Sequence, residues 1–133
     1  MVVVDTNVLA YLLIEGDQTR AAEALLEADP AWAAPRLWRS ELASVLALYV
    51  RRGELTVDEA IRRHEAAALL VRGREYDVGV DRVLATASAG PCSAYDAEFV
   101  ALAQDLDAHL VTADRALVRA FPDTARLLRD AAG

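Results

Sequence analysis

The chain has 133 residues, of which 55% are hydrophobic, and it carries a formal net charge of −7 at pH 7. Its length and composition predict one folded domain over residues 1–133 and exclude a disordered chain. The acidic balance argues against indiscriminate nucleic-acid binding, which depends on basic side chains facing phosphate, and all fourteen basic residues are arginine.

The sequence also bears on the compartment. No apolar stretch reaches the roughly 20 residues that a membrane span requires, and no signal peptide is recognisable at the N-terminus. A single cysteine, Cys92, excludes an internal disulfide, and we interpret it as a small loop thiol rather than a nucleophile. We therefore expect a cytoplasmic protein without a membrane partner.

The first half of the chain alternates short apolar runs with helical patterns. Three β-branched valines are followed directly by Asp5, and this short run predicts a buried strand over Val2–Asp5. The elements expected after it are a helix ending at Gly16, a helix capped by Asp17 and closed by Pro30, a weak strand at 32–34, a helix at 37–52 stopped by Gly53, and a helix opened by the capping box of Thr56 and Glu59.

The second half continues in the same way. The expected elements are a strand at 76–78, a helix at 80–89 broken by Gly90, a helix capped by Ser93, a strand at 109–112, a helix opened by Asp114 and stopped by Pro122, and a last strand at 125–128. Alternating strands and helices predict an α/β fold, in which helices cover both faces of a parallel or mostly parallel sheet.

Four acids stand in comparable settings along this pattern. Asp5 ends the first strand, Glu41 lies early in a helix, Asp96 lies at a helix start, and Asp114 follows the strand at 109–112. Right-handed crossovers bring successive parallel strand ends to one sheet edge, so Asp5 and Asp114 should share that edge, where ligands of open α/β sheets bind. Converging carboxylates without a lysine nearby repel one another, which indicates a metal site.

Each acid also has a purely structural explanation. Asp5 and Asp114 are suited to cap the helices that follow them, and Asp96 fits a capping box with Ser93. A glutamate in a first helical turn is common because of the helix dipole, and for Glu41 alone that explanation is favoured. The metal hypothesis rests on the four acids taken together.

Three segments resemble the PIN-domain ribonucleases, and most closely the VapC toxins of bacterial toxin–antitoxin pairs. They are Val2–Leu9, Tyr95–Ala103 and Leu110–Leu117, and together with Glu41 they extend over essentially the whole chain. The resemblance implies a PIN-like three-layer fold with a mostly parallel central sheet flanked by helices. One departure is Asp107, which stands where the family usually has glycine; aspartate tolerates left-handed backbone better than most residues.

The same resemblance implies an activity and partners. It implies a Mg²⁺- or Mn²⁺-dependent endoribonuclease acting on RNA, with Asp5, Glu41, Asp96 and Asp114 as the acidic site. It also implies a VapB-type antitoxin partner and a homodimeric toxin, forming a heterotetramer or larger assembly with the antitoxin.

The residues themselves suggest how such a site would work. Oxygen ligands without a His/Cys cluster suit Mg²⁺ or Mn²⁺, and His64 and His109 are interpreted as structural or solvated. We expect Asp5 and Asp96 to be the principal ligands and Glu41 and Asp114 to orient water or complete the shell of a second ion. Hydrogen bonds are expected from Thr6, Asn7 and Thr112.

Alternatives to this hypothesis differ in their predictions. Receiver domains and haloacid-dehalogenase-type phosphotransferases use a strand-end aspartate but also expect a lysine, which the chain lacks. A catalytically silent PIN-like module that binds RNA or a partner stays open. Trp32, Trp38 and Tyr95 are possible stacking platforms for bases, although core or partner-contact roles are favoured for the tryptophans.

Overall fold

The computed structural model describes residues 1–132. Its strands are β1 (Val2–Val4), β2 (Trp32–Pro35), β3 (Glu75–Tyr76), β4 (Leu110–Thr112) and β5 (Ala125–Leu127). Its helices are α1 (Thr6–Leu13), α2 (Thr19–Ala28), α3 (Trp38–Arg51), α4 (Val57–Leu70), α5 (Val80–Ala89), α6 (Ala94–Asp105), α7 (Arg115–Ala120) and α8 (Leu128–Ala132). Within this part of the chain, no helix is long and apolar enough to cross a membrane.

The five strands form one sheet in the order β3-β2-β1-β4-β5, and every neighbouring pair is parallel. The first strand therefore occupies the centre, where both of its edges are paired. The fold confirms the expected α/β architecture, and its sheet is wholly rather than mostly parallel.

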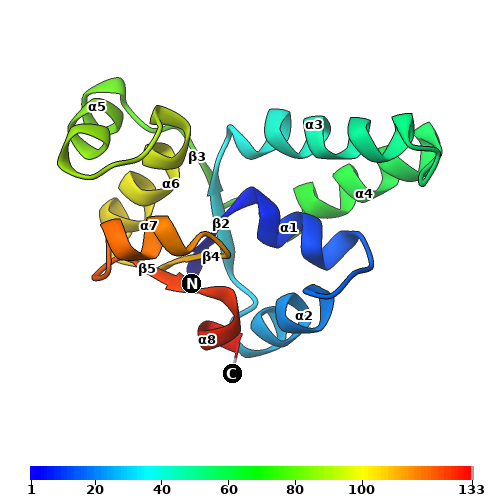
Figure 1. The fold of residues 1–133 in the computed structure, drawn as a ribbon, viewed down its shortest axis with the longest axis horizontal. Coiled ribbons are helices and arrows are strands. Elements are labelled where there is room, and N and C mark those ends of the chain that lie inside the picture. The colour runs from blue at the N-terminus through cyan, green and yellow to red at the C-terminus, as the bar shows by residue number, and fades with distance from the viewer. Residues whose placement is uncertain (133) are drawn as a thin grey trace.

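Helices cover both faces of the sheet (Figure 1). A hydrophobic core lies on each face. One core packs α1–α4 and α8 on one face, and the other packs α6 and α7 on the opposite face, with α5 against α6. Successive strand residues alternate between the cores, as the pleat requires: Val3 enters the second and Val4 the first, and Leu110 and Val111 do the same in β4. The fold thus has the three layers that were expected.

Two turn positions behave as the sequence suggested. Gly53 follows α3 with φ 75°, a left-handed conformation that suits glycine and ends the helix. Asp107 has φ 51° and is the one non-glycine residue with positive φ in the described chain. Aspartate in place of glycine therefore leaves this turn left-handed.

Four local expectations need correction. Asp17 does not cap α2: Gln18 occupies the N-cap position and makes no side-chain capping hydrogen bond. In the loop before the helix, the Gly16 N–H donates to the Thr19 hydroxyl at 3.0 Å. The third strand is Glu75–Tyr76 rather than 76–78, because these residues pair with Ala34 and Pro35. The last two corrections concern strand boundaries. The strand β4 begins at Leu110 rather than at 109, and β5 ends at Leu127 rather than at 128, because Leu128 begins α8.

The tryptophans belong to the cores. Trp32 and Trp38 are both 0% exposed, so neither is available as a platform for an RNA base. Tyr95 is 64% exposed on the surface of α6.

Candidate active site

Asp5 and Asp114 lie at the carboxyl ends of β1 and β4, two neighbouring strands in the middle of the sheet. Asp5 is the N-cap of α1 and accepts the Asn7 N–H at 3.4 Å. Asp114 is the N-cap of α7 and accepts the N–H groups of Ala116 at 2.9 Å and Leu117 at 3.3 Å. Each of these two aspartates therefore both caps a helix and lies at the common edge of the sheet.

Thr112, the last residue of β4, joins these two acids. Its side chain is fully buried, and its hydroxyl donates to Asp5 Oδ2 at 2.7 Å. The Thr112 Oγ1 atom also accepts the Asp114 N–H at 3.0 Å. One hydroxyl thereby fixes the orientation of the Asp5 carboxylate relative to the turn that carries Asp114.

Thr6 makes the corresponding link to the third acid. It is the first residue of α1, it is buried, and its hydroxyl donates to Glu41 Oε1 at 2.7 Å. Glu41 lies in the first turn of α3, so this bond holds α3 and α1 together beside Asp5. Asn7 is exposed and also borders the cleft.

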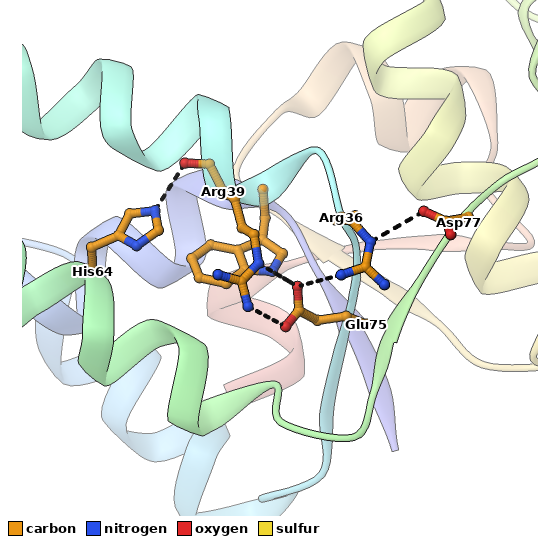
Figure 2. Close-up of polar contacts among 6 residues, drawn as sticks. Arg36, Arg39, His64, Glu75 and Asp77 are labelled. Atoms are coloured by element: carbon orange, nitrogen blue, oxygen red, sulfur yellow. Dashed lines mark hydrogen bonds and ion pairs between the residues drawn. The ribbon is translucent and has the colours of Figure 1, made fainter.

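A carboxylate on β3 anchors the start of α3, two residues before Glu41. Glu75 accepts hydrogen bonds from Trp38 Nε1 at 3.1 Å, Arg39 Nε at 2.8 Å and Arg39 Nη2 at 2.7 Å. Figure 2 shows the forked approach of Arg39 to Glu75. The bonds lower the pKa of Glu75, with the Arg39 hydrogen bond as the largest cause, and they fix the turn that carries the site glutamate.

Three further contacts extend this anchor, and Figure 2 shows the residues around it. His64 of α4 stacks on Trp38 with ring centroids 5.0 Å apart, and its Nε2 lies 2.9 Å from the Arg39 carbonyl oxygen. On the other side, Arg36 Nε pairs with Asp77 Oδ1 at 3.2 Å. His64 is therefore structural, in agreement with its lack of ligand partners in the sequence.

The fourth acid, Asp96, is brought in by α6. The Ser93 hydroxyl caps this helix by accepting the Asp96 N–H at 3.1 Å. Among residues 1–132 the reciprocal bond to the Asp96 carboxylate is not formed, so the expected capping box is only half present. The carboxylate is consequently free to face the other acids.

All four acids border one open cleft of about 420 Å³. It is lined by Asp5, Thr6, Asn7, Glu41, Ser44, Val45, Leu48, Asp96 and Asp114. Sequence reasoning missed Ser44, Val45 and Leu48, which follow Glu41 at helical spacings of three, four and seven residues and so share its face of α3. That periodicity was the signal that could have found them.

The carboxylates affect one another's protonation. Burial raises the pKa of Asp5, Glu41 and Asp96, and in each case the negative charge of a neighbouring site acid raises it further. Hydrogen bonds from Thr112 to Asp5 and from Thr6 to Glu41 act in the opposite direction and lower the pKa of these two acids. Glu98, which the sequence did not single out, adds to the repulsion on Glu41.

The chemistry of this donor set fits a hard divalent cation. The polar lining consists of carboxylate, hydroxyl and amide groups, and no arginine is among the described residues that border the cleft. In the described chain, no three His, Cys, Asp or Glu side chains already stand close enough together to hold one ion. The cleft thus offers suitable ligands and uncompensated negative charge, but its carboxylates lie too far apart for three of them to contact one ion.

Comparison with known proteins identifies the family. The family model described as the PIN domain matches residues 2–122. The chain belongs to the PIN-domain family. PIN domains are generally nucleases, and the matched segment includes all four acids and both threonines. No curated protein matches the chain significantly.

Solved structures show the same PIN fold at low sequence identity. The protein PAE2754 from Pyrobaculum aerophilum is 20% identical, with a TM-score of 0.76 over 98% of this chain and 85% of that one. A toxin–antitoxin complex from Klebsiella pneumoniae is 22% identical, with a TM-score of 0.70 over 95% and 97%. FitAcB from Neisseria gonorrhoeae is 21% identical, with a TM-score of 0.68 over 96% of each chain.

Proposed function

We propose that this PIN-domain protein is a Mg²⁺- or Mn²⁺-dependent endoribonuclease that acts as the toxin of a VapBC-type toxin–antitoxin pair. The observation that carries the proposal is that Asp5, Glu41, Asp96 and Asp114 all open into one cleft, whose lining among residues 1–132 includes no basic side chain. Family membership and the likeness in fold to a toxin–antitoxin complex support it.

In this proposal each acid has a distinct role. Asp5 and Asp96 would be the principal metal ligands, and Glu41 and Asp114 would orient the attacking water or complete the shell of a second ion. A divalent ion held by these carboxylates would lower the pKa of bound water and neutralise charge on the phosphate. Thr112 and Thr6 hold the Asp5 and Glu41 carboxylates in place, which limits the reorganisation needed when substrate arrives.

Substitution of the principal ligands tests the chemistry. Asp5→Asn and Asp96→Asn preserve shape, and asparagine still caps a helix, but each removes a charge that a hard cation requires. We expect both variants to fold with unchanged circular dichroism and to lose metal-dependent cleavage of single-stranded RNA, by roughly a hundredfold or more.

Asp107→Asn is the matched control. Asp107 precedes β4, at the opposite end of the strand from the site, and asparagine tolerates its left-handed backbone. Wild-type cleavage by either site variant would remove that residue from the mechanism. If wild type itself binds RNA without cleaving it, the chain is a silent PIN-like binding module.

The proposed antitoxin has its own support in an apolar groove between α3 and α4. The groove has a volume of about 400 Å³, and among its lining residues Val57 and Ile61 are 60% and 49% exposed. An amphipathic antitoxin helix would cover these side chains, while an arginine beside it would pair with the acidic cleft. The net charge of −7 favours such a basic partner.

Co-expression tests this partner. We expect the adjacent upstream gene to encode a small protein that co-purifies with the chain, abolishes its RNA cleavage and loses affinity for an Ile61→Asp variant. We also expect the free chain to behave as a homodimer by light scattering. Harmless expression of the chain alone, with no such neighbouring gene, would count against the toxin assignment.

A further inference from the structure

A second pocket, of about 360 Å³, adjoins the carboxylate cleft. It lies between α1, the loop that follows α1, and α3, and the two hollows share Asn7 and Val45 on their linings. Tyr11 follows Asn7 by four residues and Tyr49 follows Val45 by four, so each tyrosine stands one helical turn beyond a residue of the cleft. Because α1 packs on α3, the pocket continues the cleft along the groove between these helices.

The two tyrosines are the aromatic surfaces of this pocket. Both are half-buried, so each presents part of its ring to the solvent-filled space. Burial raises the pKa of Tyr11, and the charges of Asp5 and Tyr49 raise it further. From Asn7 to Tyr11 the helix rises about 6 Å, a distance that one nucleotide can span.

The rim of the pocket is an ordered acidic loop. Thr19 is buried; its hydroxyl donates to the Tyr11 carbonyl oxygen at 2.6 Å and accepts the Gly16 N–H at 3.0 Å. These bonds hold the loop that carries Glu15 and Asp17 against the C-terminal end of α1. Both carboxylates line the pocket and are exposed.

These features select a neutral ligand with hydrogen-bond donors. No arginine is among the described residues lining the pocket, and two carboxylates border it, so a phosphate group would be repelled. A nucleobase is uncharged, stacks on aromatic rings and offers ring N–H and exocyclic amino donors to carboxylates. Guanine presents two such donors side by side, whereas uracil presents one donor between two acceptors.

We infer that this pocket is a base subsite of the nuclease, in which a guanine next to the scissile phosphate stacks on Tyr11 or Tyr49 and donates to Glu15 or Asp17. The inference rests on the proposed ribonuclease function and adds its sequence preference. A peptide of the antitoxin is the competing occupant, but the continuity of the pocket with the acidic cleft and its acceptor-rich rim favour RNA.

The test uses single-stranded hexaribonucleotides that differ only in having G or U at one position. We expect wild type to cleave beside G on the order of tenfold faster than beside U, as one bidentate pair can provide. In Glu15→Gln/Asp17→Asn this preference should fall to within about twofold of unity, because the amides offer donors as well as acceptors. Glu23→Gln/Glu27→Gln, with the same charge change on exposed positions of α2, should keep the preference.

The tyrosines are tested separately. Tyr49→Leu should weaken binding of the G-containing oligonucleotide on the order of tenfold, and Tyr49→Phe should restore it. Binding is measured by fluorescence anisotropy in the Asp5→Asn background, so it does not depend on cleavage. If wild type cleaves no RNA, the proposed activity fails, yet a G-over-U binding preference lost in the double variant still supports the subsite.

Two results would overturn the base subsite. The first is an unchanged base preference in Glu15→Gln/Asp17→Asn together with unchanged RNA binding by Tyr49→Leu. The second is a loss of antitoxin affinity in these variants without any effect on RNA, which would assign the pocket to the protein partner.

Discussion

At the scale of single residues, two threonine hydroxyls organise the acidic cleft. Thr6 and Thr112 are 4% and 0% exposed, and the hydroxyl of each donates a hydrogen bond of 2.7 Å to a site carboxylate. A buried hydroxyl has few alternative partners, so the bond that it makes is retained. These short side chains therefore hold Glu41 and Asp5 in place without adding charge to the cleft.

Replacement of Thr112 by valine tests this positioning role. Thr112→Val keeps the shape but leaves Asp5 Oδ2 and the Asp114 N–H without their partner, at a cost of about 1–3 kcal/mol in the free energy of unfolding. Loss of the Thr112 hydrogen bond should raise the pKa of Asp5 further. We expect Mn²⁺ affinity, measured by calorimetry, to fall roughly 10–100-fold.

Thr112→Ser is the conservative control, because it keeps the hydroxyl and loses only a methyl group. It should retain most of the Mn²⁺ affinity. If valine at this position binds Mn²⁺ as tightly as threonine does, Thr112 has only a packing role.

At the scale of elements, all four acids stand at helix starts. Asp5 and Asp114 are the N-caps of α1 and α7, and Glu41 and Asp96 lie in the first turns of α3 and α6. The positive end of a helix dipole favours a carboxylate by about 0.3–1 kcal/mol at an exposed position. Four helix starts thus offset part of the repulsion that their acids create.

The anchor between β3 and α3 leads to a pH-dependent prediction. Because its bonds lower the pKa of Glu75, their contribution to stability is present above the ordinary carboxyl value of 4.5 and is lost as pH falls through the lowered value. Arg39 is 44% exposed, which screens the pair, so we expect Glu75→Gln to cost about 1 kcal/mol at pH 7. In urea unfolding, the difference from wild type should shrink as pH is lowered below 4.5.

The anchor also has a functional readout. Since Glu75 fixes the turn before Glu41, Glu75→Gln should lower RNA cleavage more than its loss of stability explains. Exposed Glu27, which belongs to α2, supplies the control Glu27→Gln, expected to match wild type in both assays. A pH-independent stability difference would mean that the Glu75 charge contributes nothing.

At the scale of the whole molecule, the cleft lies where elements from both cores meet. Asp5 extends the central strand, α1 and α3 belong to the first core, and α6 and α7 belong to the second. A cation bound among these acids would therefore link both faces of the sheet. Binding restricted to the folded state adds RT ln(1 + [L]/Kd) to the free energy of unfolding.

This linkage predicts stabilisation by metal. At a concentration one hundred times Kd, Mg²⁺ or Mn²⁺ should add about 2.7 kcal/mol, which is on the order of 5–15 °C in melting temperature for a chain of this size. Asp5→Asn should respond much less, whereas Asp107→Asn should respond as wild type does. Equal shifts in all three proteins would indicate a general salt effect and exclude Asp5 as a ligand.

Local patterns determined much of the architecture. The Thr56 capping box formed as expected, because a cap depends on adjacent residues. The valine run before Asp5 and the strand before Asp114 also formed, the latter beginning one residue later than expected, because their continuous apolar character marks buried strands. The rule that parallel strand ends share an edge was enough to bring Asp5 and Asp114 together. The sequence did not predict the cap of α2 or the helix α8. The helix α8 is only five residues long, so it carries little periodicity.

Tertiary packing decided the rest. Thr6 meets Glu41 across 35 positions in the sequence, and Thr112 meets Asp5 across 107. Two features depend on how α1 packs against α3: the face of α3 that borders the cleft, and the position of the two tyrosines in the adjoining pocket. Spacing within one helix shows which side chains share a face, but burial against other elements sets the direction of that face. For this reason the sequence predicted the acids, and only the fold revealed the pocket beside them.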